Sequence, residues 1–108
     1  MINKRIKIPL YFHNLRIIQT DNFEEVHKHY GLRGEIDYAG ITIDAGNEIV
    51  VAFNNEVTAS LIAHEALHVC SIVFKNIRCD YDRDNDEPIA YLLGWIVEQI
   101  HKTIVLKP

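Results

Sequence analysis

The segment from Val57 to Ile77 constrains the fold of this chain more than any other part of the sequence. Its apolar residues recur at the spacing of a long α-helix, and Asn55 or Thr58 is a suitable N-cap. These residues also spread around much of the helix circumference, which is typical of a buried helix. They are Leu61, Ile62, Ala66, Leu67, Val69, Ile72, Val73 and Phe74. We therefore expect a buried helix, around which the rest of a small domain packs.

Three polar residues, His64, Glu65 and His68, interrupt this apolar segment. A spacing of four residues places both imidazoles on one helix face, about one turn apart, so both can bind one Zn²⁺ ion. Glu65 directly follows the first ligand and is suited to take a proton from a zinc-bound water. A metal ion would also explain polar side chains inside a buried helix, where unpaired polar groups are costly. The sequence thus predicts a zinc site made by His64 and His68, with Glu65 as general base.

A catalytic zinc site usually has three protein ligands, so one more must come from elsewhere in the chain. We expect Glu87 to be the third ligand, because it begins a second helix after a loop long enough to reverse the chain direction. Two antiparallel helices would bring it beside His64 and His68. Three rivals for this role remain open: Asp86, Asp84 and Cys79.

The second helix carries two further residues of interest. Ala90 is small and lies one turn after Glu87, so the two helices can pack closely there. Tyr91 lies four residues after Glu87 and is expected to hydrogen-bond near the metal or to a reacting oxygen. Cys70 is expected to point to another side of the first helix. The histidines expected to take no part in the site are His13, His27, His29 and His101, the last three of them at the surface.

The residues before the long helix predict strands and one short helix. Ile6–Ile18 is rich in β-formers and favours one or two strands. Asp21 or Asn22 can cap a helix that ends at Gly31, where a left-handed residue is favoured. Residues 41–44 alternate apolar and polar, a turn follows at 45–47, and Glu48–Phe53 forms a second strand. The expected order is therefore a small sheet followed by two long helices, an α+β class.

Composition narrows the class of protein. The chain has 108 residues, which is the size of a single domain over residues 1–108. Its net charge is −4, and no basic stripe is present of the kind that nucleic-acid binding needs. No apolar run has the length that spans a bilayer, and no signal peptide is visible. With Cys70 and Cys79 expected as free thiols, we expect a cytoplasmic protein that binds neither nucleic acid nor membrane.

Two stretches, His64-Glu65-Ala66-Leu67-His68 and Glu87-Pro88-Ile89-Ala90-Tyr91, resemble the gluzincin branch of zinc metallopeptidases. In that branch a glutamate on the second helix is the third ligand, and a small residue usually follows three positions later, as Ala90 does here. This chain departs from the pattern at Tyr91, where the family often has an acidic residue. The compact chain also resembles short HExxH proteins encoded by phages and prophages.

The resemblance implies a minimal zincin-like domain, with a small twisted sheet, an active-site helix and a ligand-bearing helix. It implies a peptidase whose edge strand pairs with an extended peptide substrate, and Glu48–Phe53 is the expected edge strand. The implied reaction is hydrolysis by a zinc-activated water, with Glu65 accepting the proton and passing it to the leaving amine.

Two other hypotheses fit the same residues. A zinc-stabilised binding module would use the same ligands without turnover, which suits the small surface of so short a chain. A metal-free structural protein would keep His64 and His68 as hydrogen-bonded core residues. Metal content and peptide cleavage separate the three hypotheses.

Overall fold

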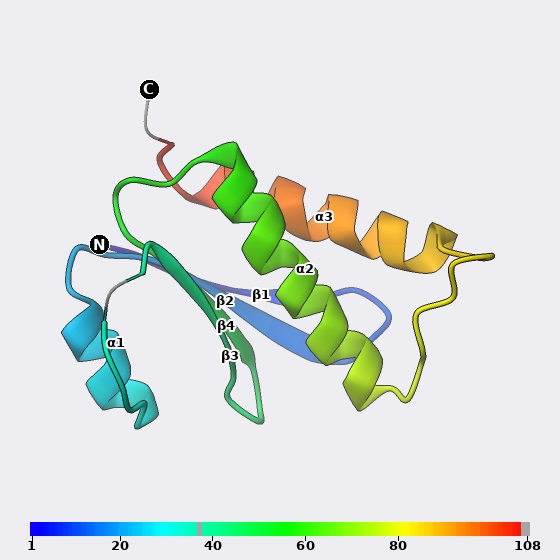
Figure 1. Cartoon of the computed structure of the whole chain (residues 1–108), viewed down its shortest axis with the longest axis horizontal. Helices are drawn as coiled ribbons and strands as arrows, with labels where there is room; N and C mark the ends of the chain where they lie inside the picture. Colours follow the sequence, from blue (N-terminus) through cyan, green and yellow to red (C-terminus); the bar gives the residue numbers. More distant parts are fainter. Residues whose placement is uncertain (37, 107–108) are drawn as a thin grey trace.

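A computed structural model of the chain describes residues 1–36 and 38–106, which form a four-stranded mixed sheet with helices on both faces (Figure 1). The expected α+β class is confirmed. The elements, in chain order, are β1 (Ile2–Ile8), β2 (His13–Gln19), α1 (Phe23–Tyr30), β3 (Gly40–Asp44), β4 (Ile49–Phe53), α2 (Ala59–Asn76) and α3 (Glu87–Thr103). In the described part of the chain, no helix combines the length and the apolar character that a membrane span requires.

The sheet has the strand order β1-β2-β4-β3. β1 and β2 form an antiparallel hairpin, and β3 and β4 form a second one, as expected for residues 41–53. The two hairpins join through parallel pairing of β2 with β4, which aligns Leu15 with Ile49 and Gln19 with Phe53. The chain between these parallel strands holds α1 and β3, so a crossover connects them.

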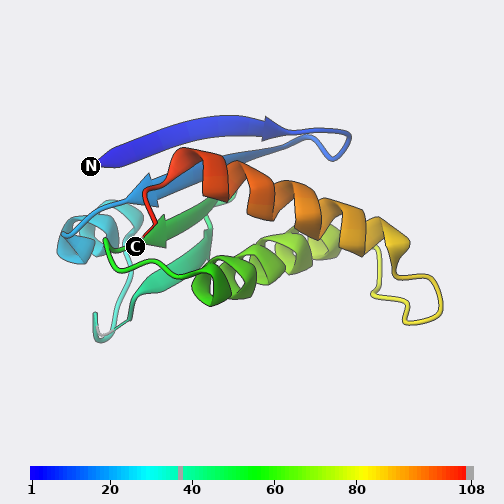
Figure 2. The same ribbon diagram turned by 90° about the horizontal axis from the view of Figure 1, so that it is seen from above.

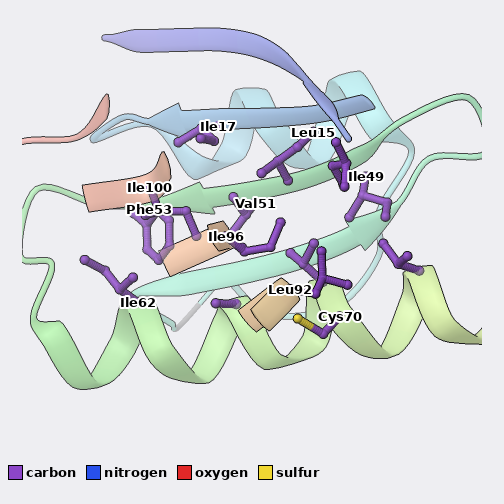
Figure 3. Packing of buried hydrophobic residues seen from close by; sticks show 14 of the residues in the cluster. Leu15, Ile17, Ile49, Val51, Phe53, Ile62, Cys70, Leu92, Ile96 and Ile100 are labelled. Atoms are coloured by element: carbon purple, nitrogen blue, oxygen red, sulfur yellow. The ribbon is translucent and has the colours of Figure 1, made fainter. Parts of the chain in front are cut away.

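The larger core lies between the sheet and the helices α2 and α3 (Figures 2 and 3). Side chains alternate between the two faces of a strand, so every second residue of β2 and β4 points into this layer. The strand residues that do so are Leu15, Ile17, Ile49, Val51 and Phe53. They pack against Ile62, Val69 and Val73 of α2 and against Leu92, Ile96 and Ile100 of α3.

The smaller core lies on the opposite face of the sheet, under α1. Ile18, Val50 and Ala52 contact Phe23 and Val26 there. α1 has the expected boundaries: the Asn22 side chain accepts the backbone N–H of Glu25, and Gly31 ends the helix at φ 64°. The sheet is therefore covered on both faces, which explains why β4 is apolar at all five positions.

The expectation that α2 is buried all round is wrong. Its boundaries and its Thr58 N-cap agree with the sequence, but the helix is amphipathic. One side packs on the sheet and on α3, while the other carries His64, Leu67 and His68 at the surface. Leu67, which the sequence favours as a core residue, is 49% exposed. The outer side of α2 has no further layer above it, so apolar residues there remain in contact with water.

The expectation that Glu48–Phe53 is the edge strand is also wrong. Residues 49–53 form β4, which lies between β2 and β3 and is fully buried. The edge strand beside α2 is β3, whose Gly40 and Thr42 lie near that helix. The reason is a long-range contact: β4 pairs with β2 as well as with β3, so β3 is left at the edge of the sheet.

Candidate metal centre

His64 and His68 lie on the outer surface of α2, with their imidazole rings facing one another. Their Nε2 atoms are 3.2 Å apart, and the ring planes meet at 75°. The spacing of four residues produces this geometry, because side chains one turn apart share a face of the helix. Each ring thus directs its Nε2 atom to one point at the edge of a groove.

The separation of these two nitrogens suits a tetrahedral metal ion. Two nitrogen ligands at the usual bond length from tetrahedral Zn²⁺ lie about 3.3 Å from each other, and the Nε2 atoms of His64 and His68 lie 3.2 Å apart. The same separation also suits a hydrogen bond in which one neutral imidazole donates to the other. Both rings are open to solvent, so a metal ion can reach them from outside. The expectation that the histidine pair is buried is wrong, so the two imidazoles need no metal ion to offset a cost of burial.

Glu65 is the buried member of the motif, at 5% exposed. Thr42 of β3 donates its hydroxyl to Glu65 Oε1 at 2.9 Å. The other oxygen, Oε2, lies 3.9 Å from His64 Nε2. One carboxylate oxygen is therefore held by the sheet, while the other faces the histidine pair. This is the arrangement that a positioned general base needs.

Gly40 of β3 creates the space in which Glu65 lies. A Cβ atom at this position would lie 3.3 Å from Glu65 Cγ, and equally close to the side chains of Leu61 and Phe53. Such contacts are tighter than ordinary van der Waals distances, so glycine lets β3 approach α2 closely. Gly40 and Thr42 together bring the edge strand against the motif.

A groove of about 450 Å³ runs between β3 and α2 at this point. Its strand wall is formed by residues 40–42, and its helix wall includes His64, Glu65 and His68. Ser71, Ile72 and Lys75 extend the helix wall toward the end of α2. The candidate metal ligands and the buried carboxylate therefore border a groove whose other wall is the edge strand β3.

The structure does not assemble a third ligand. Within residues 1–36 and 38–106, no group of three His, Cys, Asp or Glu side chains is arranged to hold a metal ion. Glu87 begins α3 as expected and is exposed, on the side of that helix opposite to its buried residues Leu92 and Ile96. The connection from α2 swings outward before α3 begins, as the yellow segment in Figure 1 shows. Glu87 as third ligand, and its rivals Asp86, Asp84 and Cys79, therefore remain predictions.

Tyr91 lies on a different part of the surface from the histidine groove. It is 75% exposed and lines a shallow pocket with Pro9 and Tyr11 of the β1–β2 turn and with Trp95. The groove that contains His64 and Glu65 has no contribution from α3 in the described residues. A role for Tyr91 at a reacting oxygen stays a prediction.

The other potential ligands take positions outside the groove. Cys70 is fully buried in the main core, as Figure 3 shows, and burial raises the pKa of its thiol to about 11. It thus points to another side of α2 from the histidine pair, as expected, and Cys79 is exposed. His29 and His101 are exposed, as predicted. His27 was expected at the surface but is buried, because its ring stacks on Tyr38.

A second cavity, of about 340 Å³, lies on the α1 side of the sheet. Three of its polar side chains pair with one another: Arg16 donates to Glu48 at 2.8 Å and to Asn3 at 2.7 Å. Arg5 also lies 3.2 Å from Glu48. Tyr30 lines this cavity, and its pKa is raised mainly by burial and next by the nearby charge of Glu48. The contacts of Arg5, Arg16 and Asn3 thus link β1 and β2 with Glu48, the residue that precedes β4.

Sequence reasoning missed Gly40 and Thr42 as members of the candidate site. The available signal was the alternation of residues 40–44, which puts Gly40, Thr42 and Asp44 on one face of the strand. Without the strand order, that face could not be assigned to α2. Comparison with protein-family models, curated proteins and solved structures finds no match for this chain.

Proposed function

We propose that the protein is a zinc-dependent metallopeptidase. The observation that carries this proposal is the convergence of two imidazole nitrogens, 3.2 Å apart, beside a buried carboxylate in a groove bordered by an edge strand. His64 and His68 would hold the ion, with Glu87 as the proposed third ligand. Zinc bound there would polarise the scissile carbonyl and make the attacking water more acidic.

Glu65 is the proposed general base and later the general acid. Its Oε2 atom, which faces the histidine pair, accepts the proton from the attacking water and then delivers it to the leaving amine. Thr42 keeps the carboxylate in this orientation through Oε1. Holding the base in place before the reaction reduces the reorganisation needed in the transition state.

The proposed substrate is an extended peptide that pairs with β3. Among the residues that the structure describes, this strand ends the sheet, so one row of its backbone N–H and C=O groups has no partner strand. A peptide that adds to this edge would run along the groove, past Glu65 and the histidine pair. The free thiols Cys70 and Cys79 support placing this activity in the cytoplasm.

The test combines zinc content with cleavage of a broad peptide library by the wild type and by Glu65→Gln. We expect the wild type to bind one zinc ion per chain and to cleave peptides. The Glu65→Gln variant should keep the zinc ion and lose about 10²- to 10⁴-fold in kcat, as expected for removal of a general base. A wild type that holds one zinc ion but cleaves no peptide would refute the peptidase proposal.

The second candidate is a zinc-stabilised binding module without turnover. The small surface of a chain of 108 residues favours this candidate, because it leaves little room for a substrate cleft. Under it, His64→Ala would lower the melting temperature in the presence of zinc, while Glu65→Gln would leave partner binding intact. Loss of peptide cleavage in Glu65→Gln, with zinc and fold retained, would exclude it.

A further inference from the structure

The turn between β1 and β2 exposes two large apolar side chains. Leu10 is 85% exposed and Phe12 is 92% exposed. Both residues have positive φ angles, 72° and 56°, in the left-handed region that side-chain-bearing L-residues rarely adopt. The turn therefore holds two apolar side chains away from the core in a strained backbone. An exposed apolar group of this kind is typical of an interaction surface.

A mostly apolar pocket of about 310 Å³ adjoins this turn. Its walls come from the turn and from the first half of α3, and they include Pro9, Tyr11, Pro88, Tyr91 and Trp95. Tyr91 at its rim is 75% exposed. Phe12 follows the lining residue Tyr11 in the chain and does not itself line the pocket. We call Leu10, Phe12 and the pocket walls the turn patch.

Residues of opposite charge precede the two parts of the turn patch in the chain, namely the turn and the first half of α3. Lys4 and Lys7 lie on β1, and Asp82 and Asp84 lie in the connection between α2 and α3. Figure 2 shows β1 and this connection on opposite sides of the beginning of α3. In the described part of the chain, neither lysine forms an ion pair. The patch thus has an apolar centre with a basic side and an acidic side.

We propose that the turn patch binds a second copy of this chain about a two-fold axis, with Phe12 of each copy inserted into the apolar pocket of the other. A two-fold interface must be complementary to itself. The turn patch meets this condition, because it carries both an apolar projection and an apolar pocket. A two-fold axis through its centre also places the basic β1 of one copy opposite the acidic connection of the other.

Charge argues against a lipid surface as the occupant. Exposed apolar and aromatic residues beside lysines are also found where proteins contact membranes. Here Asp82 and Asp84 precede part of the same patch in the chain, and anionic lipid headgroups would repel them. A second copy uses both charged sides of the patch, whereas an anionic membrane can use only one.

The test measures the solution mass of the full chain by light scattering, from micromolar to near-millimolar concentration. We expect the wild type to reach twice the 12.5 kDa mass of one chain. Phe12→Ser should weaken dimerisation at least about tenfold, as expected for loss of a central aromatic anchor. Because Phe12 is almost fully exposed, this variant should keep the wild-type fold by circular dichroism. The matched control is Val105→Ser, a 67% exposed apolar residue beyond the other end of α3, which should leave the dimer unchanged.

Three results would overturn the proposal. One is a wild type that stays monomeric at every concentration. Another is a dimer that Phe12→Ser leaves intact. The third is a monomer that binds vesicles of mixed phosphatidylcholine and phosphatidylserine through Phe12, which would assign the turn patch to a membrane. High salt should weaken the expected dimer, since the proposed contact places the basic β1 of one copy opposite the acidic connection of the other.

Discussion

Thr42 Oγ1 lies 2.9 Å from Glu65 Oε1, so the edge strand of the sheet holds the carboxylate of the HExxH motif by a direct hydrogen bond. The contact joins residues that are 23 positions apart in the sequence. It links the strand on which a peptide is proposed to bind with the group proposed to activate water.

Thr42→Val should lower kcat by about 10- to 100-fold, because a hydrogen bond to a charged group contributes about 1.5–3 kcal/mol. Valine has the same shape as threonine but no hydroxyl, so Glu65 loses the donor that fixes Oε1. Thr42→Ser keeps the hydroxyl and should restore most of the activity. Peptide cleavage at saturating substrate is the measurement. A valine variant with wild-type kcat and KM would show that Thr42 does not position the base.

Gly40→Ala should lower the free energy of unfolding by about 1–3 kcal/mol, as overpacking of a core usually does. The new methyl group would lie 3.3 Å from the side chains of Glu65, Leu61 and Phe53. Urea denaturation measures the effect. The matched control is Gly94→Ala in α3, where nothing lies within 4 Å of an added Cβ. That change should raise the free energy of unfolding by about 0.5–1 kcal/mol, because alanine favours a helix. Equal effects of the two substitutions would contradict the close approach of β3 to α2.

Glu87→Ala should weaken zinc binding, because Glu87 is the proposed third ligand. Its three rivals should be tested one at a time by Asp86→Ala, Asp84→Ala and Cys79→Ser, each of which should leave zinc affinity unchanged. Glu87 is exposed, so its removal should cost at most about 1 kcal/mol of helix-dipole stabilisation. Competition with a chelator measures the affinity of each variant. Suppose instead that the zinc affinity falls in one of the rival variants and is unchanged in Glu87→Ala. That result would assign the third ligand to the rival residue.

Cys70 should make the folded chain less stable at high pH. Burial raises the pKa of its thiol from 9.0 to about 11. Between these values the unfolded chain has released the proton while the folded chain retains it, so stability falls as pH rises through this range. The expected loss is on the order of 2 kcal/mol. Urea midpoints across this range should fall more steeply for the wild type than for Cys70→Ala. Parallel slopes would show that Cys70 ionises freely in the fold.

Much of the secondary structure could be predicted from the sequence. The caps Asn22 and Thr58, together with Gly31 at the end of α1, act locally, and the helices therefore begin and end close to the expected residues. The alternation of residues 41–44 and the segment Glu48–Phe53 likewise predicted two strands, which the structure places at Gly40–Asp44 and Ile49–Phe53. These features depend on neighbours in the chain, which the sequence displays directly.

Features set by distant contacts were harder to predict. The parallel pairing of β2 with β4 makes β3 the edge strand, and no local pattern encodes that choice. The solvent-facing side of α2 depends on which elements cover it, so Leu67 was expected in the core and lies at the surface. The course of the connection before Glu87 depends on how α3 packs, which helix periodicity alone does not determine. Thr42 entered the candidate site for the same reason, through the position of its strand in the sheet.

Zinc binding by His64 and His68 is the basis of the proposed function. Elemental analysis tests it, on purified protein that has been exposed to zinc and then passed through gel filtration. We predict one zinc ion per chain in the wild type and a loss of zinc in His64→Ala and in His68→Ala. The matched control is His101→Ala, an exposed histidine on α3, which should retain the full zinc content. A wild type without bound zinc, or an equal loss of zinc in the His101→Ala variant, would contradict the account.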